Sequence, residues 1–264
     1  MRRCLIDTVG KATLVFLAVW TTARADFPAR QYAEIRVLDA QTGRGVPLVE
    51  LETVHHVRFV TDNAGRVAIA EPDLLDRKVF FAVRSHGYEI PPAGFGYRGV
   101  RLPLRAGQKV EVRIQRRQIA ERLCRLTGEG LYRDSLLLGY QIPGPADGRA
   151  AGDGFPRRAR GLVAGQDSVQ AAVYQGRIYW FWGDTNRLAY PLGLFRTAGA
   201  RTPVFPEKEF DPTDGIPYQY FTDENGFVRP MMPLPERKEG VIWIDGVWVV
   251  PDERGQERLV CHYS

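Results

Sequence analysis

Short alternating runs of apolar and polar residues extend from Gln31 to Gln115, and this period of two predicts β-strands rather than helices. Turn residues interrupt the runs at close intervals, as at Thr42 to Gly45 and Thr61 to Gly65. Asn and Gly in such turns tolerate the left-handed backbone that a tight reversal requires. The pattern therefore predicts a β-sandwich, with strands at 32–38, 46–54, 57–60, 66–70, 78–84 and 109–114.

A second series of strands begins after Gly161, and its members are unusually aromatic. They are predicted at 169–174, 178–182, 218–221, 241–244, 247–250 and 259–263. Tight hairpin signals separate several of them, namely Gln175-Gly176, Asp223 to Gly226, Asp245-Gly246 and Asp252 to Gly255. Repeated hairpins of aromatic strands are typical of propeller blades, so the whole chain is expected to be all-β.

Residues 118–160 differ in composition from the segments on either side. The best helical window, Gln118 to Leu126, is short and runs into Thr127-Gly128-Glu129-Gly130. Gly, Pro, Arg and Ala then dominate 142–160, with turn signals at Pro143-Gly144-Pro145 and Asp147-Gly148. We predict a sandwich at 27–117, a linker and propeller entry at 118–160, and propeller strands at 161–264.

The first 25 residues have the features of a secretory signal peptide. Arg2 and Arg3 precede an apolar run from Ala12 to Trp20, which is followed by an Ala-x-Ala site ending at Ala25. The run has nine residues, whereas a membrane span needs roughly 20. We therefore expect cleavage after Ala25, export to an extracellular or periplasmic location, and no membrane span in the mature chain.

Charge argues against a nucleic-acid partner. The predicted signal holds four basic residues against one acidic, so its removal lowers the formal net charge from +5 to +2. No basic block with interleaved aromatic residues follows. The sequence also contains no nucleotide-binding loop, no serine-hydrolase motif and no spaced Cys/His cluster, so we expect neither a cofactor nor a metal. Whether Cys124 and Cys261 pair is left open by the sequence.

Two motifs invite a metal-binding interpretation, and for each a structural interpretation is favoured. His86-Gly87-Tyr88-Glu89 has the spacing of a zinc pair, but no third ligand stands at a matching place. Asp211-Pro212-Thr213-Asp214-Gly215 carries oxygen ligands but not the full twelve-residue calcium loop, so an ordinary turn is expected.

Three strings in the first half of the chain combine turn residues with the ends of predicted strands. These are Ile35-Arg-Val-Leu-Asp39-Ala-Gln-Thr-Gly43-Arg-Gly-Val-Pro47, Thr61-Asp-Asn-Ala-Gly65-Arg, and Val83-Arg-Ser-His-Gly87-Tyr-Glu89. Together they resemble the carboxypeptidase regulatory-like family of transthyretin-type sandwiches. The resemblance implies an accessory spacer or binding module of a secreted protein, not a catalyst.

The segment from Gly165 to Asn186 is the densest motif of the chain. An Asp opens one strand, a Gly hairpin follows, and an aromatic strand ends on Gly183-Asp184-Thr185. This pattern resembles the first blade of five-bladed propeller glycoside hydrolases of the arabinanase and xylosidase type. The resemblance implies that Asp167 is the general base and that the partner is a polysaccharide or other glycan. The alternative for Asp167 is a carboxylate that caps a turn or strand. For Asp184 a turn-forming role is favoured, and the alternative is a second carboxylate at the mouth of the funnel. Candidate substrate-binding residues are Trp180, Trp182, Tyr190 and Arg229.

Two departures from the family pattern qualify the enzyme interpretation. Ser168 follows Asp167 where the family has Pro, and no later Glu matches the family's general acid. The hairpins also suffice for only two or three blades, so an incomplete propeller and a truncated chain are expected. The sequence leaves two functions open, a glycoside-hydrolase-like protein and a propeller that binds glycans or proteins without turnover.

Overall fold

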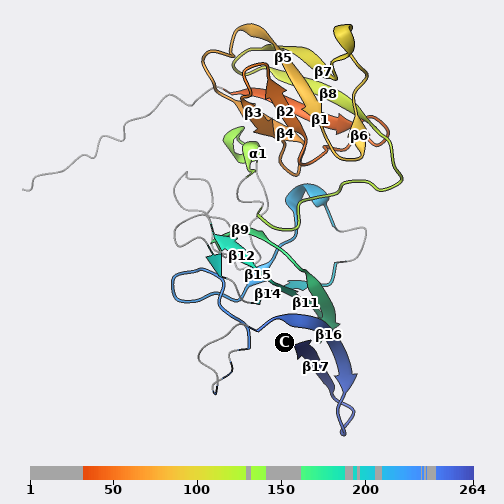
Figure 1. Ribbon diagram of the computed structural model, residues 1–264, viewed down its shortest axis with the longest axis vertical. Helices are drawn as coiled ribbons and strands as arrows, with labels where there is room; N and C mark the ends of the chain where they lie inside the picture. The colour runs from red at the N-terminus through yellow and green to blue at the C-terminus, as the bar shows by residue number, and fades with distance from the viewer. Residues whose placement is uncertain are drawn as a thin grey trace, which may run out of the picture. The chain divides into compact units, whose positions relative to one another are not determined.

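The computed structural model confirms an all-β chain in the residues it describes, which are 32–128, 132–140, 162–187, 193–194, 197–205, 210–232, 234, 236 and 242–264 (Figure 1). The predicted signal peptide lies outside these residues. Within these ranges, helical structure is limited to the short helix α1 (Asp134–Leu137) and to single 3₁₀ turns. Nowhere in the described ranges is there a helix with the length and apolarity to cross a bilayer.

The N-terminal half contains two four-stranded sheets. The first has the order β4-β1-β8-β6, and β1 pairs with β8 in parallel and with β4 in the antiparallel sense. Its strands are β1 (Ala33–Asp39), β4 (Arg66–Ile69), β6 (Tyr88–Glu89) and β8 (Lys109–Arg116). The second has the order β3-β2-β5-β7 and is antiparallel throughout, with β2 (Glu50–Thr53), β3 (Arg58–Val60), β5 (Arg77–Arg84) and β7 (Gly99–Leu104).

Both sheets contribute to one apolar core, as the predicted sandwich requires. Ile35 and Val112 from the first sheet are buried in the same cluster as Leu51 and Phe81 from the second. The alternation of the strands explains this, because every second side chain faces inward. On β8, for example, Val112 and Ile114 are buried whereas Glu111 and Arg113 are exposed.

The predicted turn at 61–65 is present and fixes the start of β4. The Asp62 carboxylate accepts hydrogen bonds from the backbone N–H groups of Ala64 and Arg66, both at 3.0 Å. Gly65 adopts φ +72°, and a Cβ at this position would lie 2.4 Å from the Val37 carbonyl oxygen. Glycine is therefore required there for both conformational and steric reasons.

The segment after β8 is irregular, and the short helical window at 118–126 forms no helix. Arg122 instead anchors extended chain to the sandwich. Its guanidinium donates to the carbonyl oxygens of Pro47, Leu48 and His86, at 3.0 to 3.2 Å, and to Ser85 Oγ at 3.3 Å. Half-burial of the Arg122 guanidinium lowers its pKa.

A second anchor is formed by α1, which covers the edge strand β4. Asp134 Oδ2 accepts a hydrogen bond of 2.7 Å from the Ala68 N–H, which points away from the sheet. The Ser135 N–H in turn donates to Asp62 Oδ2 at 2.7 Å. Burial, reinforced by the negative charge of Asp62, raises the pKa of Asp134 to about 6, against an opposing contribution from the Ala68 hydrogen bond.

Tyr140 completes this contact on the outer face of the first sheet. Its ring lies beneath the Arg66 guanidinium, 3.8 Å from ring centroid to Cζ, and its hydroxyl donates to Glu34 Oε2 at 2.9 Å. Lys109 Nζ donates to the same hydroxyl at 2.7 Å. The described parts of the predicted linker thus contact the sandwich through specific polar groups.

The C-terminal half contains three further sheets. The largest is antiparallel, with the order β10-β11-β14-β15, and a smaller one has the order β13-β12-β9. The third is the hairpin of β16 and β17. The strands are β9 (Val163–Gln166), β10 (Gln170–Tyr174), β11 (Arg177–Trp182), β12 (Thr185–Arg187), β13 (Gly193–Leu194), β14 (Ala198–Pro203), β15 (Gln219–Tyr220), β16 (Ile244–Pro251) and β17 (Glu257–Tyr263).

One predicted hairpin of this half is wrong. Asp245-Gly246 does not reverse the chain but lies inside β16, where the pairing with β17 shifts register between Ile244 and Gly246. The predicted hairpins at Gln175-Gly176 and at 252–255 are confirmed. Gln175 and Gly176 both adopt positive φ, as a two-residue turn between twisted strands requires.

Candidate functional site

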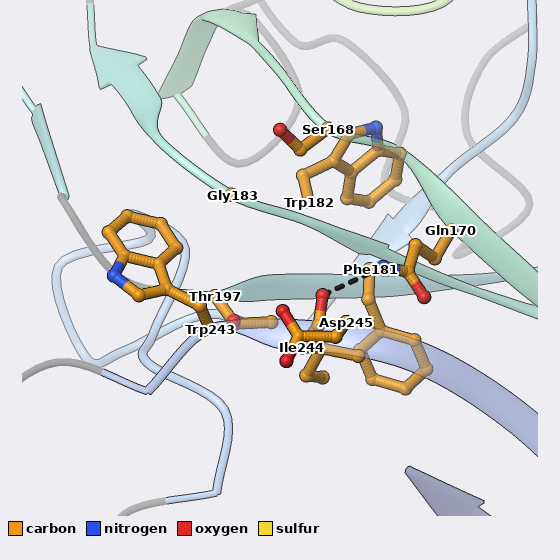
Figure 2. Close-up of a pocket in the computed structure, with 9 residues that line it drawn as sticks. All are labelled: Ser168, Gln170, Phe181, Trp182, Gly183, Thr197, Trp243, Ile244 and Asp245. Carbon is orange, nitrogen blue, oxygen red and sulfur yellow. Dashed lines mark hydrogen bonds between the residues drawn. The ribbon is translucent and has the colours of Figure 1, made fainter. Parts of the chain in front are cut away.

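The aromatic strand β11 places its rings on two faces. Trp180 and Trp182 stack with their ring centroids 6.3 Å apart and an interplanar angle of 10°. Figure 2 shows the Phe181 ring on the opposite side of the strand from Trp182. This agrees with the alternation expected of an extended strand.

The two tryptophans predicted to stack against a sugar form a packed cluster. Tyr218 meets both rings edge-on, at centroid distances of 5.5 and 5.0 Å. Trp182 is only 2% exposed, and Trp180 Nε1 donates to the buried Thr202 Oγ1 at 3.0 Å. These contacts make the pair a stabilising element of the largest C-terminal sheet.

The Asp167 carboxylate contacts the backbone of Asp184. The Asp184 N–H donates to Asp167 Oδ1 at 3.0 Å, and the Gly183 N–H donates to the Asp167 carbonyl oxygen, also at 3.0 Å. Gly183 permits this contact, because a Cβ there would lie 2.6 Å from Asp167 Oδ1. The Asp167 carboxylate therefore holds the turn that ends β11.

The Asp184 side chain is half-buried. Its Oδ1 is enclosed, and no group in the described ranges donates a hydrogen bond to it. A buried carboxylate oxygen without a donor is costly and normally has a partner, which makes Asp184 a chemically unusual group beside Asp167.

A pocket of about 350 Å³ lies next to this turn, between the β10 and β11 strands and the start of β16. Figure 2 shows that the side chains of Phe181, Thr197, Trp243 and Asp245 gather below β11. The pocket is lined by Ser168, Gln170, Phe181, Trp182, Gly183, Thr197, Trp243, Ile244 and Asp245. Its volume falls within the range of about 300 to 1,000 Å³ that is typical of ligand sites.

Hydrogen bonds fix the polar rim of the pocket. Gln170 Nε2 donates to the Ile244 carbonyl oxygen at 2.7 Å, and Thr197 Oγ1 donates to the Ile242 carbonyl oxygen at 2.8 Å. Both bonds join the 242–244 backbone to the sheet that carries Phe181. Contacts between three separate segments therefore hold the pocket.

Asp245 provides the carboxylate of the pocket. Its Oδ2 lies 3.2 Å from Nδ1 of His262, which is on the neighbouring strand β17. The Asp245 side chain is nevertheless about half exposed, so it remains accessible to a ligand. Neither Asp167 nor Asp184 lines this pocket.

The remaining predicted residues are not brought into the pocket. Arg229 is exposed, and its backbone N–H donates to the Phe221 carbonyl oxygen at 2.9 Å. Tyr190 lies outside the described residues. The Asp211 side chain accepts a hydrogen bond from the Thr213 N–H at 2.9 Å and so forms an ordinary turn, as expected.

The sequence did not identify Trp243, Asp245 or Gln170 as residues of the site. The first two were assigned to a strand and a turn because Asp-Gly is the commonest short hairpin signal. The spacing of two between Trp243 and Asp245 was the available clue, since it places an indole and a carboxylate on one side of an extended chain. Among the described residues, no group of three or more His, Cys, Asp or Glu side chains is arranged to hold a metal ion.

Comparison with known proteins adds no relative. No family model matches the chain, and no curated protein or solved structure matches it either.

Proposed function

We propose that this chain is a secreted glycan-binding protein, in which an accessory sandwich precedes propeller-type sheets related to those of glycoside hydrolases. The observation that carries the proposal is the presence of the Trp243 indole and the Asp245 carboxylate in one pocket. An aromatic face can stack on the apolar face of a sugar ring, while carboxylate and amide groups bind its hydroxyls.

The propeller assignment is supported by the sheet β10-β11-β14-β15. It has four antiparallel strands, which is the strand number of a propeller blade. Export is supported by the charged and apolar pattern of the first 25 residues.

Binding without turnover is favoured over hydrolysis because the pocket contains one carboxylate. Glycosidases of either stereochemistry use two, at separations of about 5 to 9.5 Å across the scissile bond. The Asp167 carboxylate accepts a hydrogen bond from the Asp184 N–H, and the Asp245 carboxylate lies 3.2 Å from His262 Nδ1. Hydrolysis remains the second candidate, favoured by the position of the Asp184 carboxyl, with its enclosed Oδ1, beside Asp167.

The test is calorimetric titration of the full chain with xylose, arabinose, xylan and arabinan. We expect binding by the wild type and at least tenfold weaker binding by Trp243→Ala and Asp245→Ala. Phe95→Ala is the matched control, because Phe95 is a fully exposed aromatic residue on a loop of the sandwich. Absence of binding to every glycan, or undiminished binding by both pocket variants, would contradict the proposal. Release of reducing sugar by the wild type would favour the hydrolytic candidate.

A further inference from the structure

One face of the β16–β17 hairpin carries large apolar side chains that are exposed to solvent. Trp248 and Val260 are directly opposite each other across the two strands, and they are 53% and 40% exposed. Val250 lies on the same face, two residues beyond Trp248, because side chains alternate along a strand. The other face of the hairpin is better covered, with Val249 and Leu259 half-buried.

The Trp248 ring is held against its own strand. A Cβ on Gly246 would lie 2.4 Å from Cη2 and 2.7 Å from Cζ2 of Trp248, so the indole lies over the bare backbone of Gly246. Any larger residue at position 246 would displace the ring. Glycine therefore gives the exposed indole a fixed orientation, which lowers the entropic cost of stacking a ligand on it.

Polar groups stand at one edge of this ring. His262 is opposite Gly246, so its side chain lies on the same face as Trp248 and Val260. His262 Nδ1 is 3.2 Å from Asp245 Oδ2, and Asp245 also lines the pocket described above. Asp245 thus connects the pocket to the exposed indole.

We propose that Trp248, His262 and Asp245 form a second sugar subsite, contiguous with the pocket, so that the ligand is an oligosaccharide rather than a single sugar. This inference rests on the proposed glycan-binding function. One sugar unit occupies the pocket beside Trp243, and a following unit stacks on Trp248. The Asp245 carboxylate and the free ring nitrogen of His262 bind hydroxyl groups at the edge of the stacked ring.

The arrangement matches what stacked sugar binding requires. An indole supplies a large apolar surface at low conformational cost, and polar groups beside it fix the orientation of the ligand. Along this face Trp248, Val250 and Val260 are apolar, with His262 at one end and the exposed Arg258, opposite Val250, at the other. His262 and its neighbour Asp245 are the polar groups on the side of the pocket.

The experiment measures affinity as a function of ligand length. Xylo- and arabino-oligosaccharides of one to six units are titrated into the full chain and into Trp248→Ala and Trp248→Phe. We expect wild-type affinity to rise with length, and Trp248→Ala to lose about three- to tenfold for the longest ligand while binding the monosaccharide unchanged. Trp248→Phe keeps an aromatic face and should retain most of the gain.

Val260→Ala is the matched control, because it removes apolar area from the same face without removing the ring. Equal length dependence in wild type and Trp248→Ala would overturn the subsite while leaving the pocket in place. No binding of any length would instead refute the proposed function. If Trp248→Ala abolishes self-association or capture of a protein partner rather than length dependence, the face is a protein interface and the subsite is refuted.

Discussion

Asp167 Oδ1 lies 3.0 Å from the backbone nitrogen of Asp184 and accepts its hydrogen bond. Replacement of Asp167 by Ala removes this acceptor, and we expect the free energy of unfolding to fall by about 1 kcal/mol because the bond is partly solvated. Asp167→Asn keeps an acceptor oxygen and should lose less than half of that. Urea denaturation of both variants measures the difference. An equal loss in both variants would show that the negative charge, and not the hydrogen bond, is what the turn requires.

The same pair allows a functional test of Asp167. If the chain hydrolyses a glycan, Asp167→Asn should abolish turnover while leaving glycan affinity within about twofold. Activity assays on the polysaccharide that binds best, together with titration of the variant, separate the two roles. Unchanged turnover in Asp167→Asn would restrict Asp167 to holding the turn.

Gly183 is expected to tolerate no side chain. A Cβ there would lie 2.6 Å from Asp167 Oδ1 and 3.4 Å from Trp243 Cζ3, so Gly183→Ala should displace the carboxylate and cost about 1 to 3 kcal/mol. Gly165→Ala is the control, because a Cβ at 165 meets nothing within 4 Å. In an Asp167→Ala background most of the cost of Gly183→Ala should disappear, which a double-mutant cycle of unfolding free energies measures. If the losses caused by Gly183→Ala and Asp167→Ala add, the methyl group introduced at position 183 does not clash with the Asp167 carboxylate.

Asp134 gives the sandwich a predictable pH dependence. Its pKa is raised to about 6 in the folded chain, against 3.8 for the free group, so between these values the folded state binds more protons than the unfolded state. The stability that this group contributes is therefore fully present below about pH 4 and is lost as the pH rises through about 6. The free energy of unfolding falls by about 3 kcal/mol at most over this range.

Asp134→Asn isolates this effect, because the amide oxygen can still accept from the Ala68 N–H but does not titrate. Unfolding free energies of wild type and variant, measured from pH 4 to 7, should converge at the acid end and separate towards neutrality, with the variant more stable. Parallel profiles would show that Asp134 does not titrate in this range.

Arg122 is expected to contribute strongly to the stability of the sandwich. Replacement by Ala leaves the carbonyl oxygens of Pro47 and His86 without their donor, and we expect a loss of about 2 kcal/mol. Arg113→Ala is the matched control. Arg113 forms an exposed pair with Glu111 at 3.5 Å, and such pairs contribute at most about 1 kcal/mol. Thermal unfolding should show a lower melting temperature for Arg122→Ala than for Arg113→Ala. Equal melting temperatures would contradict the prediction.

Many strands were predictable because alternation leaves a clear signature, as at Ala33–Asp39 and Arg77–Arg84. Six were not predicted, namely β6, β7, β9, β12, β13 and β14. β7 contains Pro103, which argues against a strand, but β7 is an edge strand, where the missing N–H breaks no ladder bond. The helical window at 118–126 forms no helix, and a contact distant in sequence accounts for this. The Arg122 guanidinium bonds to the sandwich backbone, and no local pattern records such a distant contact.

The candidate site was predictable only in its local part. The closeness of Asp167 and Asp184 follows from one hairpin and the strand end that it carries, so sequence spacing was sufficient. The pocket depends on bonds such as that from Gln170 to the Ile244 carbonyl oxygen, 74 residues away. Alternation also placed Trp180 and Trp182 on one face correctly, but it could not say that Tyr218 would cover them.

The bond from the Ala68 N–H to Asp134 has a consequence for the order of events during synthesis. β4 forms one edge of its sheet, and the group that covers its outward N–H lies 66 residues further along the chain. On a ribosome, all strands of the sandwich emerge before Asp134 does. Throughout that interval the β4 edge is open to water or to a strand of a neighbouring nascent chain, which makes it the point at which mispairing between chains is most favoured.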